Sequence, residues 1–286
     1  MVEFENMRTG VIGVGSMGRH HARVYNEISN LVAVADPDKE QGESIAAKYG
    51  VKYFSNYEEM LDSVDAVSVA VPTKYHLSVC EKVSKSKVHI LVEKPLAGTF
   101  KDARDLKNLA DANGIVLSVG HIERHNSVVK EAKNFIESGL WGKLSTISAR
   151  RFSSYPVRIN DVGVLFDLTI HDVDVVRYLS GSEVKSVYAS GGNCINKEYE
   201  DFVCLLMNFE NGITGICQTN WLSSNKVREI DFFGDVVCAN LDYIEQKLKV
   251  DFKSDIGTVK SEVIRAQKTE PLPNEISDFL ESISQG

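Results

Sequence analysis

A glycine-rich turn between a short apolar run and an amphipathic segment constrains this chain most. Three glycines follow the spacing G-x-G-x-x-G. In a strand–turn–helix unit the first permits the tight turn, the second lets the backbone approach a pyrophosphate, and the third lets helix and strand pack closely. The free N–H groups at the start of the helix attract phosphate. The pattern predicts a dinucleotide-binding turn with the candidate contacts Gly13, Gly15, Ser16, Met17 and Gly18.

An acidic residue ends the next predicted strand. Residues 31–35 form a second buried run, and Asp36 stands at its carboxyl end. Asp36 follows the glycines by about twenty residues, where a carboxylate binds the adenosine ribose hydroxyls and repels a 2′-phosphate. We therefore expect NAD as the cofactor, with NADP less favoured, although nearby Lys39 leaves NADP open.

The first part of the chain alternates strands with helices. Further strands are predicted at residues 51–54, 65–71, 88–92 and 114–119. Continuous apolar runs such as 65–71 are typical of parallel strands that are covered on both faces. A βαβ series of this kind predicts an α/β fold, a doubly wound parallel sheet of the Rossmann type. We assign residues 1–121 to this domain.

From residue 122 the pattern changes to long alternating segments. Strands are predicted at residues 144–152, 184–190, 202–209, 213–221 and 227–233, and one helix at 168–179. A run of strands after βαβ units predicts a second, α+β domain with a large, mainly antiparallel open sheet. We assign residues 122–286 to it. A helix predicted at 274–284 has no closing element after it, which suggests a truncated C-terminus.

The open sheet also bears on assembly. Monomers rarely leave broad apolar surface bare, so we expect a homodimer or homotetramer that associates through the sheet of the second domain.

Composition excludes several classes of protein. The formal net charge of −8 argues against non-specific nucleic-acid binding. The longest apolar runs are too short to span a bilayer, so no membrane segment is expected. The N-terminus lacks the pattern of a signal peptide. The five cysteines form no C-x-x-C pair, which favours reduced thiols and a cytoplasmic protein.

Two further motifs lie downstream of the glycine turn, Glu93-Lys94-Pro95 and Asp167-x-x-x-His171-Asp172-x-Asp174. Together with the glycines they resemble the glucose–fructose oxidoreductase/inositol dehydrogenase/MocA family over nearly the whole chain. The resemblance implies an NAD-dependent dehydrogenase. The segments 120–126 and 156–163 look like the branch that oxidises UDP-N-acetylglucosamine at C3. Family members usually carry a further C-terminal segment that this sequence lacks.

Three residues are candidates for catalysis. The resemblance implies that Lys94 binds the reacting hydroxyl, where an ammonium favours alkoxide character; the alternative is a solvated surface lysine. It makes His171 the general base, a role that suits a neutral imidazole. Asp167, four residues earlier on the same helix face, is its partner or a substrate anchor. Alternatively His171 is satisfied by Asp174 and Asp167 only caps a helix.

No metal is expected, because neither a cysteine pair nor a His-x-x-x-His motif accompanies these residues.

Further cofactor contacts are expected after two strands. The loop with Pro72, Thr73 and His76 lies beside the nicotinamide in similar proteins, although Thr73 is equally well explained as a helix cap. Glu93 is expected to meet ribose hydroxyls or hold Lys94, with a simple ion pair as the alternative. His20 and His21 are interpreted as packing or solvent residues.

A UDP-sugar brings two phosphate charges, which arginine forks bind well. Candidate substrate contacts are Arg124, Asn126 and Arg158, with Arg158 favoured for phosphate or sugar, beside Asp167 and His171. A plain surface role is the alternative for each.

The resemblance thus implies NAD-dependent oxidation of UDP-N-acetylglucosamine to the 3-keto sugar. One rival is the corresponding uronic acid, which needs one more cationic group near the sugar carboxylate. Another is a free polyol such as inositol. A rival of another class is a non-catalytic dinucleotide-binding regulator, which should have lost Lys94 or His171, and both are present.

Overall fold

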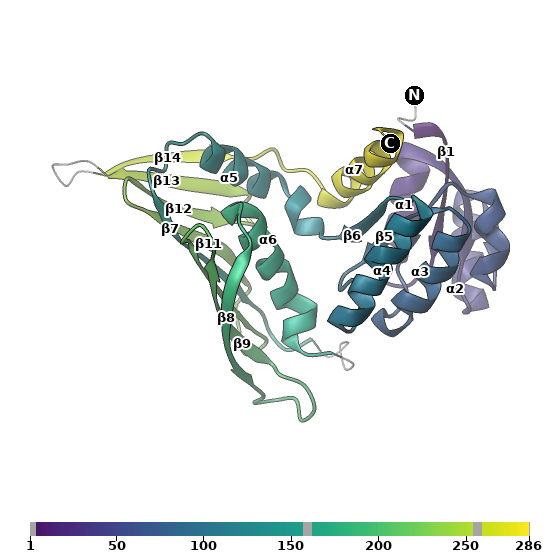
Figure 1. Ribbon diagram of the computed structural model, residues 1–286, viewed down its shortest axis with the longest axis horizontal. Coiled ribbons are helices and arrows are strands. Elements are labelled where there is room, and N and C mark those ends of the chain that lie inside the picture. The colour runs from purple at the N-terminus through teal and green to yellow at the C-terminus, as the bar shows by residue number, and fades with distance from the viewer. Residues whose placement is uncertain (1–3, 157–161, 254–258, 286) are drawn as a thin grey trace. The chain divides into compact units, whose positions relative to one another are not determined.

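The computed structural model describes residues 4–156, 162–253 and 259–285. Its contacts divide the chain into a first unit, residues 1–122 with 270–286, and a second unit, residues 123–269. Figure 1 labels the helices and strands of both units.

The first unit is built on a six-stranded parallel sheet in the order β3-β2-β1-β4-β5-β6. This is the doubly wound order, whose direction of winding reverses between β1 and β4. The strands are β1 (Phe4–Ile12), β2 (Ser29–Ala35), β3 (Lys52–Phe54), β4 (Ala66–Val69), β5 (His89–Glu93) and β6 (Leu117–Gly120). The predicted Rossmann-type sheet is confirmed.

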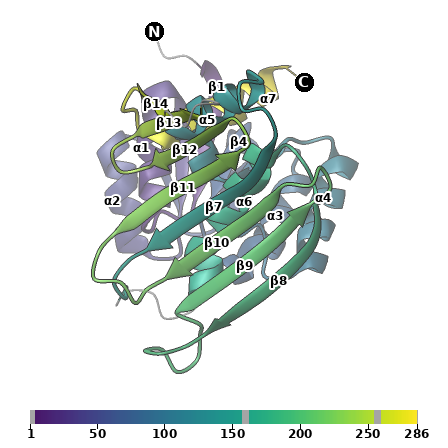
Figure 2. The same cartoon turned by 90° about the vertical axis from the view of Figure 1, so that its left-hand side faces the viewer.

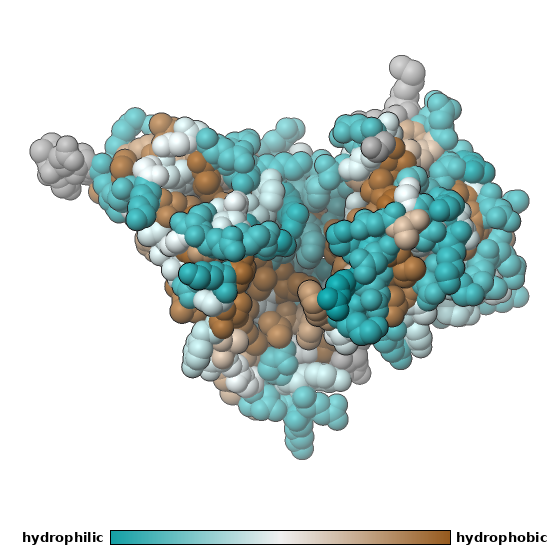
Figure 3. All heavy atoms as spheres, viewed as in Figure 1, coloured by the Kyte–Doolittle hydropathy of each residue, from teal (hydrophilic) through white to brown (hydrophobic). Residues whose placement is uncertain are grey.

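Helices cover both faces of this sheet. One face carries α1 (Gly18–Ile28), α2 (Lys39–Tyr49) and α7 (Pro271–Gln285), and the other carries α3 (His76–Lys85) and α4 (Phe100–Asn113). Alternate strand residues supply the two cores, so Val11 packs on the α1 side and Ile12 on the α3 side. The outer surface of α4 is hydrophilic (Figure 3).

The C-terminal helix belongs to the first unit, whereas the sequence-based boundary places it in the second domain. Leu272, Ile276, Phe279 and Leu280 of α7 are buried in the same core as Tyr25 of α1. Burial of four large apolar side chains there stabilises this position by several kcal/mol, at about 1.5–3 kcal/mol each. Helical periodicity predicts an apolar face but not the sheet on which that face packs.

The second unit is built on an eight-stranded sheet in the order β14-β13-β12-β11-β7-β10-β9-β8. All neighbouring strands are antiparallel except β7 and β10, so the expected mainly antiparallel sheet is confirmed. The strands are β7 (Leu144–Phe152), β8 (Val184–Gly192), β9 (Phe202–Phe209), β10 (Thr214–Asn220), β11 (Val227–Gly234), β12 (Val237–Asp242), β13 (Lys247–Lys253) and β14 (Val259–Arg265).

Two helices, α5 (Ser127–Glu137) and α6 (Ile170–Ser180), pack on one face of this sheet. We call this the inner face, and Figure 2 looks onto the opposite, outer face. Along β7 the inner positions Ile147 and Ala149 are fully buried. The outer face is mixed, because exposed Leu206 and Phe233 share it with Arg150, which pairs with Glu229 and Asp231 of β11.

Within the described residues, no helix combines the length and the apolar character that crossing a membrane requires. The five cysteines are free thiols.

Candidate active site

The glycine-rich turn follows β1 and opens α1, and its three glycines have different surroundings. Gly13 has a φ of +83°, and a Cβ there would lie 2.9 Å from the Ala70 carbonyl oxygen. A Cβ at Gly18 would lie 1.8 Å from the Gly13 carbonyl oxygen, whereas one at Gly15 would meet nothing within 4 Å. Gly13 and Gly18 are therefore required by the fold. Gly15 borders open space, where a ligand can approach the protein backbone closely. Ser16 and Met17 are exposed at the start of α1.

Asp36 directly follows β2 and is buried beside this turn. One carboxylate oxygen accepts the Val14 N–H at 2.8 Å and the Gln41 side chain at 3.1 Å, and the other accepts the Asp38 N–H at 2.8 Å. The carboxylate thus holds the glycine turn. Each oxygen of a carboxylate has two acceptor sites, so Asp36 retains acceptor capacity toward a ribose hydroxyl.

A cavity of about 610 Å³ lies at the carboxyl ends of β1, β2 and β4. Its volume falls within the range of about 300–1,000 Å³ that is usual for small-molecule and cofactor sites. The predicted cofactor contacts Gly13, Gly15, Asp36 and Pro72 line it, together with Tyr57, Tyr75 and Val79. The residues fit a dinucleotide, because the cavity joins an open glycine, a helix start and a carboxylate acceptor.

A chain of hydrogen bonds leads from α1 to the residue before Lys94. Tyr25 lies 2.9 Å from the Ser68 hydroxyl, which lies 2.8 Å from His21 Nδ1, and His21 Nε2 lies 3.0 Å from Glu93 Oε1. The other Glu93 oxygen accepts the Lys94 backbone N–H at 3.2 Å. Burial opposes ionisation of Glu93, but the contact with His21 and the charge of Lys94 lower its pKa below the ordinary value.

Within this chain of hydrogen bonds, His21 is the residue whose role the sequence did not predict. It is 1% exposed, and its contacts with Ser68 and Glu93 make it a link between α1 and β5 rather than a packing or solvent residue. The available signal was its place on the apolar face of α1, four residues before buried Tyr25. The exposed neighbour His20 fits the original interpretation.

His76 contacts protein carbonyls through both ring nitrogens. Nδ1 lies 3.0 Å from the Pro95 oxygen and Nε2 lies 2.9 Å from the Val71 oxygen, and the side chain is buried. These contacts join the loops that follow β4 and β5. His76 is therefore occupied in positioning the loop of Lys94, and direct contact with the nicotinamide remains a prediction.

The two other loop candidates, Thr73 and Lys94, are both half-buried. Thr73 lies in a short 3-10 turn (Thr73–Tyr75) and does not cap α3 through its side chain. Lys94 is half-buried, and its peptide bond to Pro95 is cis.

Asp167 and His171 lie where α6 begins in the second unit. A wide π-helical turn (Leu165–Thr169) precedes the regular helix, so Asp167 falls in the π turn and His171 in the first turn of α6. Single π turns often occur at functional sites. Both side chains are half-buried.

A buried ion cluster fixes this end of α6 to the inner face of the sheet. Arg151 donates to Asp172 at 2.9 Å and to Glu123 at 2.9 Å, and it lies 5.2 Å over the Tyr243 ring. Burial opposes the charge of Arg151, but the two carboxylates raise its pKa above the ordinary value. The cluster determines the position of the residue next to His171.

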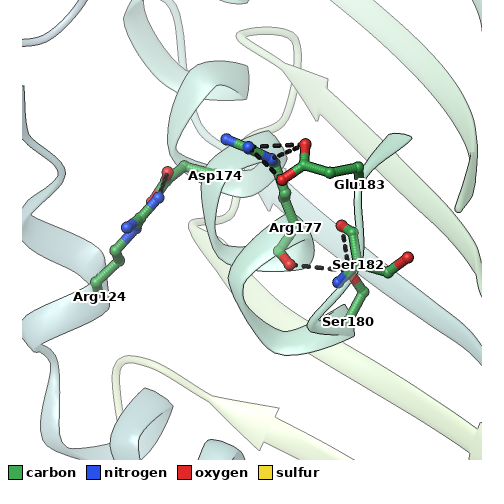
Figure 4. A network of polar contacts seen from close by, with 6 residues as sticks. All are labelled: Arg124, Asp174, Arg177, Ser180, Ser182 and Glu183. Atoms are coloured by element: carbon green, nitrogen blue, oxygen red, sulfur yellow. Dashed lines mark hydrogen bonds and ion pairs between the residues drawn. The ribbon is translucent and has the colours of Figure 1, made fainter. Parts of the chain in front are cut away.

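The predicted substrate contacts fall in different surroundings. Arg124 donates to both oxygens of Asp174 at 2.7 and 2.5 Å, beside a second pair between Arg177 and Glu183 (Figure 4). Asn126 is buried and caps α5 by accepting the Val128 N–H at 3.2 Å. Arg158 lies outside the described residues. The guanidinium of Arg124 and the amide of Asn126 thus have structural tasks, and their contact with substrate remains a prediction.

A doubly wound sheet with this glycine turn, and with a cavity that Asp36 lines, is typical of a dinucleotide-binding protein. Residues 7–121 match the oxidoreductase family model with an NAD-binding Rossmann fold, and residues 129–236 match the GFO/IDH/MocA C-terminal domain. The chain belongs to this glucose–fructose oxidoreductase/inositol dehydrogenase/MocA family and is an NAD-binding oxidoreductase.

Comparison with individual proteins agrees. The chain is 32% identical over 98% of its length to a UDP-N-acetylglucosamine 3-dehydrogenase from Acidithiobacillus ferrooxidans, of which 89% is covered. The solved structure of that enzyme matches with a TM-score of 0.90 at 31% identity, covering 98% of this chain and 89% of the other.

Two other matches are to dehydrogenases that are named for other substrates. A myo-inositol 2-dehydrogenase from Thermotoga maritima is 30% identical over 73% of this chain and 67% of its own length. A levoglucosan dehydrogenase in complex with NADH has a TM-score of 0.88 at 21% identity, covering 98% of this chain and 90% of the other, and it shows the shared fold.

Proposed function

We propose that this protein oxidises the C3 hydroxyl of UDP-N-acetylglucosamine with NAD and so forms the 3-keto sugar. The supporting observation is its similarity, over almost the whole chain, to the Acidithiobacillus ferrooxidans enzyme that carries this name.

The first unit holds the cofactor in this proposal. The open space at Gly15 accommodates the pyrophosphate, Asp36 accepts from the adenosine ribose, and Pro72 borders the cavity toward the nicotinamide. Bound NAD supplies the hydride acceptor, so that the carbon bearing the hydroxyl becomes a carbonyl carbon.

Three side chains carry the proton chemistry. His171 takes the hydroxyl proton on its imidazole as the C–H hydride leaves. Lys94 donates a hydrogen bond to the same oxygen and stabilises its developing negative charge. Asp167, within a turn of His171, orients the imidazole or anchors a sugar hydroxyl. The contact of Glu93 with His21 and with the Lys94 backbone supports the position of that lysine.

We also propose that two or four copies associate through the outer face of the sheet. Exposed apolar side chains such as Leu206 and Phe233 on that face support association. The paired charges of Arg150, Glu229 and Asp231 indicate a contact of mixed polarity. Sedimentation at micromolar concentration tests it, with a single monomer boundary as the contrary result.

A second candidate is oxidation of a free polyol, which the similarity to the inositol dehydrogenase favours. The two are separated by incubating the protein with NAD and a panel of substrates while NADH absorbance is followed. The panel contains UDP-N-acetylglucosamine, its uronic acid, N-acetylglucosamine and myo-inositol. NADH formation with UDP-N-acetylglucosamine, at a kcat/KM well above that for the unphosphorylated compounds, is expected. Turnover of inositol alone contradicts the nucleotide-sugar assignment, and cofactor binding without any turnover favours a regulator.

A further inference from the structure

Two arginines lie directly opposite each other on neighbouring strands of the second unit. Arg228 of β11 pairs in register with Arg151 of β7. Both face the inner side of the sheet, because Arg228 lies on the same face of β11 as the fully buried Ile230 and Phe232. Like charges that are directly opposite on a sheet destabilise it, so this arrangement needs an explanation.

The carboxylates nearby contact only one of the two arginines. Asp172 and Glu123 both accept hydrogen bonds from Arg151. Within residues 4–156, 162–253 and 259–285, the side chain of Arg228 makes neither an ion pair nor a hydrogen bond. Lys226, two residues earlier and exposed, is likewise without an ion pair in the same ranges. Three cations therefore face two carboxylates at this end of the sheet.

The surroundings of Arg228 and Lys226 oppose the positive charges of both side chains. Burial and the charge of Arg151 lower the pKa of Arg228, and the charge of Arg228 lowers the pKa of Lys226. A half-buried guanidinium that lacks a counter-charge is destabilising, and an incoming anion would remove that penalty.

Arg228 lies at the end of the inner face where α6 begins. The backbone oxygen of Arg228 accepts the Tyr243 N–H at 3.1 Å, and Tyr243 also packs under Arg151. Asp172, which holds Arg151 and lies close enough to affect Arg228, is adjacent in sequence to His171. The guanidinium of Arg228, which has no ion pair within the described residues, thus lies in the same part of the second unit as the candidate base.

We propose that Arg228, assisted by Lys226, binds the anionic group of the sugar substrate. This inference rests on the proposed function, which supplies such a group. An arginine fork suits phosphate and carboxylate oxygens equally. The shared chemistry is therefore a pair of anionic oxygens, from either the diphosphate of a nucleotide sugar or the carboxylate of a sugar acid.

Binding of UDP to the NAD-saturated protein tests the proposal without turnover. Saturation with NAD keeps UDP out of the dinucleotide cavity, and calorimetry measures the affinity. Arg228→Gln should weaken UDP binding by about 10–100-fold, the loss expected for hydrogen bonds to a charged group. The UDP affinity of Arg228→Lys should fall between those of the wild type and Arg228→Gln, because lysine keeps the charge but lacks the planar fork of donors. Arg265→Gln, an exposed arginine of the same sheet, is the matched control and should bind like the wild type.

Thermal unfolding separates a binding role from a structural one. Because Arg228→Gln removes the repulsion with Arg151, its melting temperature should equal or exceed that of the wild type. An Arg228→Gln variant that unfolds at a lower temperature while binding UDP normally would overturn the proposal. So would a wild-type protein that binds neither UDP nor glucuronate.

A second titration identifies the source of the anionic oxygens. UDP binding that depends on Arg228 assigns the diphosphate, and glucuronate binding that depends on Arg228, without UDP binding, assigns the carboxylate. Since neither titration needs oxidation, a protein that binds UDP through Arg228 but fails to oxidise UDP-N-acetylglucosamine refutes the proposed function alone.

Discussion

His21 Nε2 lies 3.0 Å from Glu93 Oε1, and this contact joins the helix that follows the glycine turn to the strand that ends at Glu93, the residue before Lys94. The segment proposed to bind the cofactor and the segment proposed to carry catalysis are thereby connected through one side-chain pair. Glu93 in turn accepts the Lys94 backbone N–H. The pair is expected to position Lys94 rather than to contact the substrate.

Replacing His21 should therefore impair the chemical step. His21→Leu removes the contact with Glu93 and should lower kcat by up to about 100-fold, the scale reported for small misplacements of reacting groups, while NAD affinity changes little. Steady-state kinetics with NAD and sugar varied separately measures this. His20→Leu, exposed on the same helix, is the control and should behave like the wild type. Equal losses in both variants would refute the positioning role.

The glycines of the turn should separate binding from folding. Gly15→Ala introduces a Cβ that meets no protein atom within 4 Å, so the melting temperature should hold while NAD binding weakens. Gly18→Ala places a Cβ 1.8 Å from a backbone oxygen and should destabilise the fold by about 1–3 kcal/mol or more. Denaturant unfolding and NAD titration of both variants test this contrast. An unaltered NAD affinity in Gly15→Ala would mean that the pyrophosphate lies elsewhere.

Asp36 should determine the choice between NAD and NADP. Asp36→Asn removes the negative charge that repels a 2′-phosphate while keeping one oxygen to accept the Val14 N–H. The ratio of kcat/KM for NADP over NAD should rise by about tenfold or more, since one repelling charge contributes on the order of 1–2 kcal/mol at short range. An unchanged ratio would show that the carboxylate does not face the ribose.

Asp201 should make stability depend on pH in the acid range. Its carboxylate accepts the backbone N–H groups of Cys194 at 2.9 Å, Ile195 at 2.6 Å and Asn196 at 3.1 Å. Burial opposes ionisation, but these hydrogen bonds lower its pKa. Because the folded value lies below the unfolded one, the stabilisation is present above the ordinary pKa of about 3.9 and is lost as pH falls through the folded value.

Asp201→Asn should thus destabilise the protein by about 1–3 kcal/mol at pH 7. The difference from the wild type should shrink below about pH 4. Thermal unfolding of both proteins from pH 7 to pH 3 measures it. A difference that is constant over this range would show that the charge of Asp201 contributes nothing.

Much of the fold could be predicted because strand alternation and apolar runs report burial directly. The predicted strands 144–152 and 202–209 coincide with β7 and β9. The strands β12, β13 and β14 were missed. The turn between β12 and β13 places Gln246 at a φ of +50°, whereas sequence rules look for glycine or asparagine there.

The site was predictable in part, because motifs identify residues but not their partners. The spacing of Gly13 and Asp36 identified the cofactor cavity that both line. Arg124 is expected to contact the substrate, but the sequence does not reveal its bidentate pair with Asp174. The link between His21 and Glu93, residues 72 positions apart, depends on the tertiary fold, which one sequence does not specify. The same holds for Arg228, whose side chain makes no ion pair within the described part of the chain.

In the proposed reaction, hydride leaves C3 of UDP-N-acetylglucosamine for NAD. Mass spectrometry of the reduced cofactor, after reaction with UDP-N-acetylglucosamine that carries deuterium at C3, follows this transfer. We expect NADH that is heavier by one deuterium, together with a sugar product lighter by the deuterium and the hydroxyl proton. Unlabelled NADH, or no NADH with this substrate while inositol is oxidised, would contradict it.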